Sequence, residues 1–192
     1  MNIVKSLLLV VIGFLFVMCN TSQSFANPSN VSLTTSAGVK TVNATIIINA
    51  PNKVVWDVIT NYNQFTQFMP GIKQFNIIQN AGTTKKAVVK LDVSKLMKAF
   101  NYQATICENF ASKNLTMERT SGDLNLLKLS FNLKSLDNGS KTLLTYKVNV
   151  DHGNGIPSGF ADRALKSNVE NTLKAVNTVS LQKNANLKIA IK

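Results

Sequence analysis

The chain has 192 residues, a formal net charge of +12 and two cysteines, so it is long enough for one domain with its own core and has no disulfide framework. Its 21 basic residues are mostly lysine and are scattered along the chain, which argues against the clustered surface of a nucleic-acid-binding protein. Such a charge still favours contact with an anionic membrane surface.

The first 26 residues have the features of a secretory signal peptide. Lys5 precedes a continuous apolar run from Leu7 to Met18, and Ser24-Phe25-Ala26 fits a small-x-small cleavage site. The run is too short for a membrane anchor, because about 20 residues are needed to span a bilayer. We therefore expect a secreted protein, in the bacterial periplasm, after cleavage near Ala26.

The rest of the chain divides into three parts by composition. Residues 27–41 are rich in Ser, Thr and Asn and are expected to form a flexible leader. Residues 42–182 carry the apolar periodicities of one folded domain. Residues 183–192 are expected to form a basic tail.

The domain opens with a strand and two short helices. Residues 42–49 are rich in β-branched side chains, which favours a strand. Pro51 suits the first turn of a helix, and apolar residues then recur at helical spacing from Val54 to Ile59. A second helical turn is expected over residues 64–68, ending at Pro70-Gly71.

An antiparallel sheet and a long helix complete the predicted domain. Apolar and polar side chains alternate, which is typical of strands with one buried face, over residues 72–79, 85–93, 100–107, 114–120, 124–134 and 141–151. The final helix is expected over residues 157–182. It has an apolar stripe that can cover the sheet, formed by Leu165, Val169, Leu173, Val176 and either Val179 or Ser180.

Two segments resemble the START-like (SRPBCC) superfamily, in particular its polyketide cyclase/dehydrase and coenzyme Q-binding members. The first joins Ala50-Pro51 to the V-W-D-V-I-T helix at Val55–Thr60 and to the aromatic segment Phe65–Ile72. The second is E-R-T-S-G-D at Glu118–Asp123. The resemblance covers residues 42–181 and is more specific for the fold than for the function.

The resemblance and the predicted order of elements imply the same fold class. It is an α+β, helix-grip (START-like) fold, in which a curved antiparallel sheet wraps around a long C-terminal helix and two short helices follow the first strand. In that family the space between sheet and helix is a deep apolar pocket. The resemblance therefore implies a hydrophobic small-molecule ligand.

Strand alternation and the aromatic segment give the candidate pocket residues, which are Tyr102, Met117, Arg119, Phe131, Tyr146, Phe65 and Met69. An inward arginine is costly unless it is paired, so Arg119 is expected to meet either a ligand or a carboxylate such as Asp123 or Glu118. The hydroxyls of Tyr102 and Tyr146 also need hydrogen-bonding partners.

A candidate membrane-contact loop joins two strand segments. It places the apolar side chains of Leu96, Met97 and Phe100 beside the positive charges of Lys95 and Lys98. Apolar residues flanked by lysine can insert into an anionic membrane surface. The alternative is that the same residues pack on the C-terminal helix.

Catalytic and metal-binding patterns are scarce. The chain has one histidine, His152, which is expected at the surface, and no spacing that links it to Cys107 as a nucleophile pair. We therefore expect no metal and no cofactor, and we favour a binding protein over an enzyme. The preferred hypothesis is a monomeric carrier of a lipid, quinone or isoprenoid. A cyclase or dehydrase acting in the same pocket and a closed interior without a ligand are the alternatives.

Overall fold

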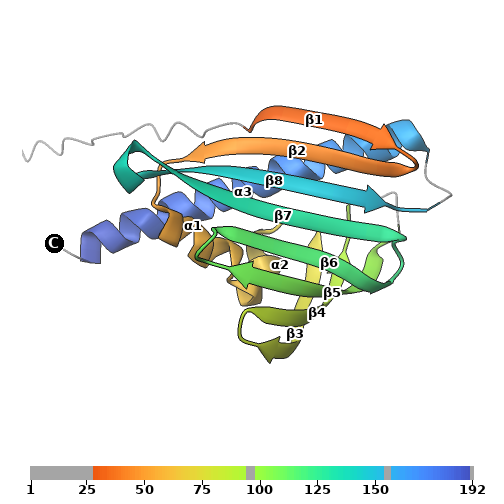
Figure 1. Cartoon of the computed structure of the whole chain (residues 1–192), viewed down its shortest axis with the longest axis horizontal. Helices are drawn as coiled ribbons and strands as arrows, with labels where there is room; N and C mark the ends of the chain where they lie inside the picture. Colours follow the sequence, from red (N-terminus) through yellow and green to blue (C-terminus); the bar gives the residue numbers. More distant parts are fainter. Residues whose placement is uncertain (1–27, 94–97, 154–156, 191–192) are drawn as a thin grey trace, which may run out of the picture.

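The computed structural model of the chain describes residues 28–93, 98–153 and 157–190. In these residues an eight-stranded antiparallel sheet curves around one long helix, and shorter helices lie beside that helix (Figure 1). This is the helix-grip arrangement expected from the sequence. The predicted signal peptide lies outside the described residues.

The elements follow the predicted order, with one additional strand at the start. The strands are β1 (Ser29–Ser36), β2 (Val39–Ile48), β3 (Ile72–Ala81), β4 (Thr84–Leu91), β5 (Phe100–Asn109), β6 (Asn114–Gly122), β7 (Leu126–Leu136) and β8 (Lys141–Asp151). The helices are α1 (Asn52–Ile59), α2 (Phe65–Phe68) and α3 (Ser158–Ala190), with 3-10 turns η1 (Tyr62–Gln64) and η2 (Asp137–Gly139). The order across the sheet is β1-β2-β8-β7-β6-β5-β4-β3, so the chain returns at β8 to pair with β2.

A β-hairpin takes the place of the flexible leader expected over residues 27–41. Strand β1 pairs antiparallel with β2 across a turn at Ala37 and Gly38, both of which have positive φ. Val31 and Leu33 alternate with polar residues along β1 and pack against the core. A Ser/Thr-rich composition suggested disorder, but these residue types are also compatible with an edge strand that has a neighbour to pair with.

The C-terminal helix is longer than expected, because it continues through Ala190 where a basic tail was predicted. Two polar contacts hold this part of α3 to the body of the domain. Lys183 Nζ lies 3.2 Å from a carboxylate oxygen of Asp57, and Asn184 Nδ2 donates to Asn49 O at 3.1 Å.

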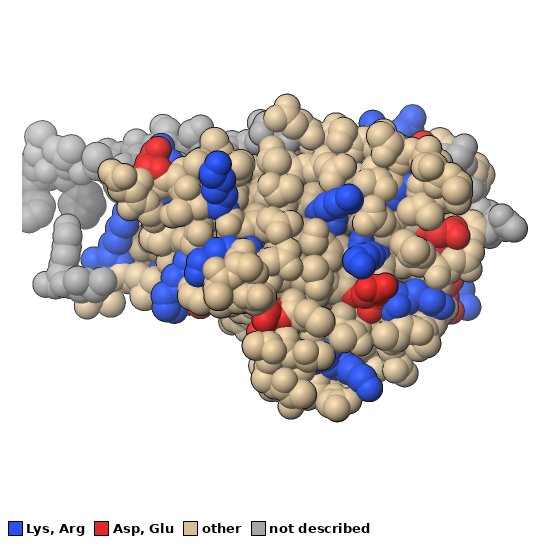
Figure 2. Space-filling model, in the orientation of Figure 1, with Lys and Arg blue, Asp and Glu red and all other residues tan. Residues whose placement is uncertain are grey.

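The core lies between the concave face of the sheet and α3. Inward side chains of β2, from Val42 to Ile48, are fully buried at every second position. On α3, the predicted stripe is buried at Val169, Leu173 and Val176. At the end of the stripe, Ser180 is fully buried and Val179 is partly buried. Polar residues occupy the convex face, where Lys and Arg are spread with acidic side chains between some of them (Figure 2).

Truncation of the helix stripe tests this packing. Leu173 is 0 % exposed, so we expect Leu173→Ala to lower the free energy of unfolding by about 2–5 kcal/mol through lost burial and a new cavity. The matched control is Leu187→Ala on the same helix, where the side chain is 44 % exposed and the expected change is within about 0.5 kcal/mol. Urea unfolding followed by the fluorescence of Trp56, the single tryptophan, measures both variants. Equal losses would contradict the packing described here.

Candidate functional site

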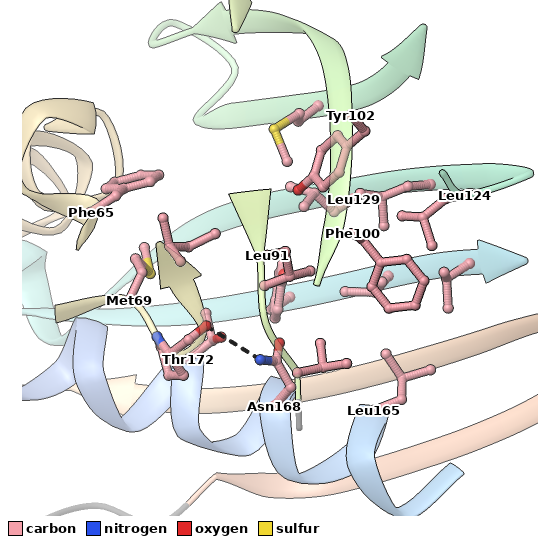
Figure 3. A pocket seen from close by; sticks show the side chains of 18 of the residues that line it. Phe65, Met69, Leu91, Phe100, Tyr102, Leu124, Leu129, Leu165, Asn168 and Thr172 are labelled. Carbon is pink, nitrogen blue, oxygen red and sulfur yellow. Dashed lines mark hydrogen bonds between the residues drawn. The ribbon is translucent and has the colours of Figure 1, made fainter. Parts of the chain in front are cut away.

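A cavity lies between the concave face of the sheet and the N-terminal half of α3. Its volume is about 140 Å³. Figure 3 shows apolar side chains from the sheet, from α2 and from α3 converging on this space, among them Phe65, Met69, Leu91, Phe100, Leu124, Leu129 and Leu165. The interior is therefore not closed by its own side chains, which was one alternative left open by the sequence.

Six of the seven candidate pocket residues line the cavity, namely Tyr102, Met117, Phe131, Tyr146, Phe65 and Met69. Strand register brings most of them together. Met117 on β6 is opposite Ile106 on β5, and Phe131 on β7 is opposite Tyr146 on β8. The rings of Phe131 and Tyr146 stack with centroids 4.3 Å apart. Their contact with a ligand remains a prediction.

Arg119 does not line the cavity, and its expected carboxylate partners are engaged elsewhere. Its guanidinium donates to backbone oxygens instead, from Nη2 to Gly122 O at 2.7 Å and from Nη1 to Asn125 O at 3.3 Å. Glu118 pairs with Lys128, and Asp123 accepts from the Asn101 amide. The reason is local: β6 and β7 separate after Glu118, and this leaves carbonyls in the connection for the arginine to cap.

The segment Glu118–Asp123 has a structural role next to the cavity. Gly122 has a φ of +115°, and a Cβ at this position would lie 2.5 Å from Tyr102 Cα, so only glycine fits so close to β5. The Asp123 carboxylate accepts from Asn101 N at 2.8 Å, and this hydrogen bond holds the pKa of Asp123 below its usual value. Together these contacts fix the part of β5 that carries Tyr102.

Tyr102 and Tyr146 line the cavity with hydroxyls that the described residues leave unengaged. Both residues are buried, with 4 % and 6 % exposure, and neither hydroxyl has a hydrogen bond to any residue that the structure describes. Burial raises the pKa of both phenols well above the usual value, and the proximity of Tyr146 raises the pKa of Tyr102 further. Each hydroxyl is therefore neutral at physiological pH and available to a ligand.

The third tyrosine, Tyr62, is engaged by the protein. Its ring lines the cavity and stacks on Phe75 with centroids 5.3 Å apart, while its hydroxyl donates to Glu108 Oε1 at 2.6 Å. Lys85 Nζ lies 2.8 Å from the same oxygen. Burial and the Glu108 carboxylate both raise the pKa of Tyr62. This hydroxyl therefore anchors η1 to β5 and is not available to a ligand.

Lys40 and His152 are among the cavity-wall residues that were not identified as site candidates from the sequence. Lys40 is 6 % exposed, points inward in phase with Val42, and pairs with Asp162 of α3 at 2.5 Å. Extending the alternation of β2 back by one step predicts this orientation, but residue 40 had been assigned to the leader. His152 continues the inward phase of Val150, and its buried Nδ1 has no partner among the described residues.

The candidate membrane-contact loop lies mostly outside the described residues, which do not include Lys95, Leu96 and Met97. Of its two remaining members, Lys98 is exposed and Phe100 lines the cavity. The membrane hypothesis for this loop therefore remains a prediction. Among the described residues, no helix has the length and apolar character to cross a membrane.

The part of the chain that the structure describes contains no group of three or more His, Cys, Asp or Glu residues that could hold a metal ion. Cys107 is exposed. On β5 it alternates with the inward-facing Ile106, so it lies on the opposite face of the sheet from the cavity.

Comparisons with known proteins agree with this geometry. The family model described as polyketide cyclase/dehydrase and lipid transport matches residues 48–177. Similar solved structures include the Zhui aromatase/cyclase from Streptomyces sp. R1128, at TM-score 0.63 and 15% identity, covering 76% of this chain and 93% of that one. A START superfamily protein from Mycobacterium smegmatis has TM-score 0.63 and 14% identity, covering 74% of this chain and 97% of that one. At such identities the likeness shows the fold. No curated protein sequence gives a significant match.

Alkaline titration tests the environment of the cavity tyrosines. The chain has three tyrosines, and the pKa of each is raised in the folded state. We expect no tyrosinate absorbance from the folded protein half a unit above pH 10, whereas the protein in guanidinium should titrate near the ordinary pKa of about 10. The pKa values of the tyrosines are higher in the folded protein than in the unfolded chain. The free energy of unfolding should therefore keep its full contribution from these groups below pH 10 and decrease as the pH rises further. A tyrosine that titrates at its ordinary pKa in the folded protein would contradict its burial.

Proposed function

Because the chain belongs to the polyketide cyclase/dehydrase and lipid transport family, we propose that it binds a hydrophobic small molecule, such as a lipid, quinone or isoprenoid, between its sheet and α3. The observation that carries this proposal is the apolar cavity whose wall includes two tyrosines with unengaged hydroxyls. Binding sites for small molecules typically combine an apolar wall with a few polar groups that fix orientation.

The energetics favour an apolar ligand with one polar atom near the two tyrosines. Each square ångström of apolar surface that leaves water contributes roughly 25 cal/mol. A ligand carbonyl or hydroxyl oxygen can accept a hydrogen bond from Tyr102 or Tyr146, whose hydroxyls have no hydrogen bond to the described residues. An apolar ligand without such an oxygen would leave both donors unpaired.

The N-terminal segment of the sequence bears on where in the cell the protein would act. A signal peptide over residues 1–26 would place the mature protein outside the cytoplasm, where a soluble carrier can move an apolar molecule between membranes. The mass of the intact protein, purified from its own host, shows whether residues 1–26 have been cleaved off. A mature chain that begins at Asn27 is the expected result, and a retained residue 1–26 segment would contradict secretion by this route.

A cyclase or dehydrase is the second candidate function, favoured by the likeness to a structure described as an aromatase/cyclase. In this hypothesis the cavity would hold a polyketone substrate in a bent conformation. Tyr102, Tyr146 and His152 would supply hydrogen bonds to its oxygens. Two measurements on the purified protein distinguish the carrier from the enzyme: organic extraction of a bound molecule and incubation with an added substrate. A carrier releases the molecule it bound unchanged, whereas an enzyme converts an added polyketone substrate to product.

Blocking the cavity tests whether it is the binding site. Ala164 lines the cavity from α3, so Ala164→Trp should fill the space. We expect it to weaken binding of the neutral fluorescent probe N-phenyl-1-naphthylamine by about tenfold or more, because accommodating the ring costs packing energy.

The matched control is Ala185→Trp, which adds the same ring at an exposed position of the same helix. This control should bind the probe as the unmodified protein does, and native mass spectrometry should show one bound probe per chain. Equal binding by both variants, or no probe binding by the unmodified protein, would overturn the proposal.

A further inference from the structure

We propose that Lys40 forms an anion-binding site at one end of the cavity, so that the ligand is an apolar molecule with a carboxylate head. This inference rests on the proposed function, because it names the chemical class of the molecule that occupies the same cavity. It assigns a role to the one lysine in the cavity wall and to the ion pair that it forms with α3.

The side chain of Lys40 is almost entirely removed from water. It lies on the concave face of β2, opposite Val150 of β8, and 7 % of its side chain is exposed. A buried ammonium group requires an anionic or hydrogen-bonding partner. Its partner in this structure is Asp162, at 2.5 Å.

The ion pair leaves part of the ammonium group unused. A lysine ammonium has three N–H donors. Asp162 accepts one of them, and no other described residue accepts a hydrogen bond from Lys40. Because Lys40 lines the cavity, the remaining donors are available to a ligand, and a carboxylate has the acceptor oxygens and the charge to use them.

The two partners of the ion pair are unequally buried, which lets a ligand compete for the lysine. The Asp162 side chain is 36 % exposed, so its carboxylate can turn toward water at a small cost. The Lys40 side chain is much less accessible to water, at 7 % exposure. A ligand carboxylate can therefore share the ammonium with Asp162 or replace it.

His152 strengthens the polar character of this end of the cavity. It follows β8 two residues after Val150, the residue opposite Lys40, so the two side chains are diagonal neighbours on one face. Its Nδ1 is buried and unpartnered within residues 28–93, 98–153 and 157–190. Nδ1 can donate to a second carboxylate oxygen when it carries the proton.

The cavity is long enough to hold an acyl chain behind such a head. Ala161, near the start of α3, and Thr172 both line the cavity, and they are eleven residues apart along the helix, a distance of about 16 Å. Along this path Leu165, Asn168 and Thr172 follow one another on α3 and lead toward Met69 (Figure 3). The geometry therefore places the head at Lys40 and the apolar end at α2.

Decanoate and 1-decanol test this assignment, because they share a chain length and differ in charge. Each is used at about pH 8, where the carboxyl group is ionised, to displace N-phenyl-1-naphthylamine from the full chain. We expect decanoate to bind the unmodified protein more tightly than 1-decanol by on the order of 10-fold, the effect of one charge-assisted hydrogen bond.

The informative variant is Lys40→Met with Asp162→Asn. It removes the ammonium group but leaves the net charge of the pair at zero, so a general electrostatic effect cannot account for a change. We expect the preference for decanoate to disappear while the affinity for 1-decanol stays within about twofold. In Asp162→Asn alone, the preference should increase because the competing carboxylate is gone. Trp56 fluorescence verifies that each variant is folded.

The outcomes separate this inference from the proposed function. An unchanged preference in the double variant, or tighter binding of 1-decanol than of decanoate by the unmodified protein, would overturn the anion site and leave the apolar carrier intact. Failure of the unmodified protein to bind either the probe or 1-decanol would overturn the proposed function, and the anion site with it.

Discussion

The structure depends on how one helix covers one face of a strongly curved sheet. The concave face carries the inward side chains of the strands and must be removed from water. The C-terminal half of α3 does this together with α1, and Leu173 and Val176 are fully buried there. Toward its N-terminus α3 presents the small residues Ala161 and Ala164, which leave space between the helix and the sheet. The cavity is therefore a consequence of where the helix side chains are large and where they are small.

Polar groups around this cavity fall into two classes, according to whether the protein satisfies them. The hydroxyl of Tyr62 donates to Glu108 and acts on the architecture of the protein. The hydroxyls of Tyr102 and Tyr146 have no acceptor among the described residues and face the cavity. In a medium of low dielectric constant an unsatisfied donor is costly, so in the proposed function these hydroxyls are the groups that a ligand's polar atoms would meet.

The residues that identify the family mainly build the fold. The segment Glu118–Asp123 caps a turn and fixes β5 through Gly122, and the helix at Val55–Thr60 supplies buried side chains to the core. Neither segment places a reactive group in the cavity. This explains why one fold can serve binding proteins and enzymes, since the cavity wall can vary while the residues that shape the sheet remain.

Strand alternation and helical spacing predicted the order of the elements from residue 42 onward, and together with the resemblance to the START-like superfamily they predicted the fold class. Six of the seven candidate residues, four from strand alternation and two from the aromatic segment, line the cavity. The sequence did not determine the hairpin of β1 and β2, since the composition of residues 27–41 is compatible with disorder and with an edge strand. Only the tertiary structure decided that Arg119 caps a turn and that Lys40 meets Asp162, 122 residues away. The alternation of apolar and polar residues along a strand predicts the face of the sheet on which a side chain lies. The partner of that side chain depends on which distant segments the fold brings beside it.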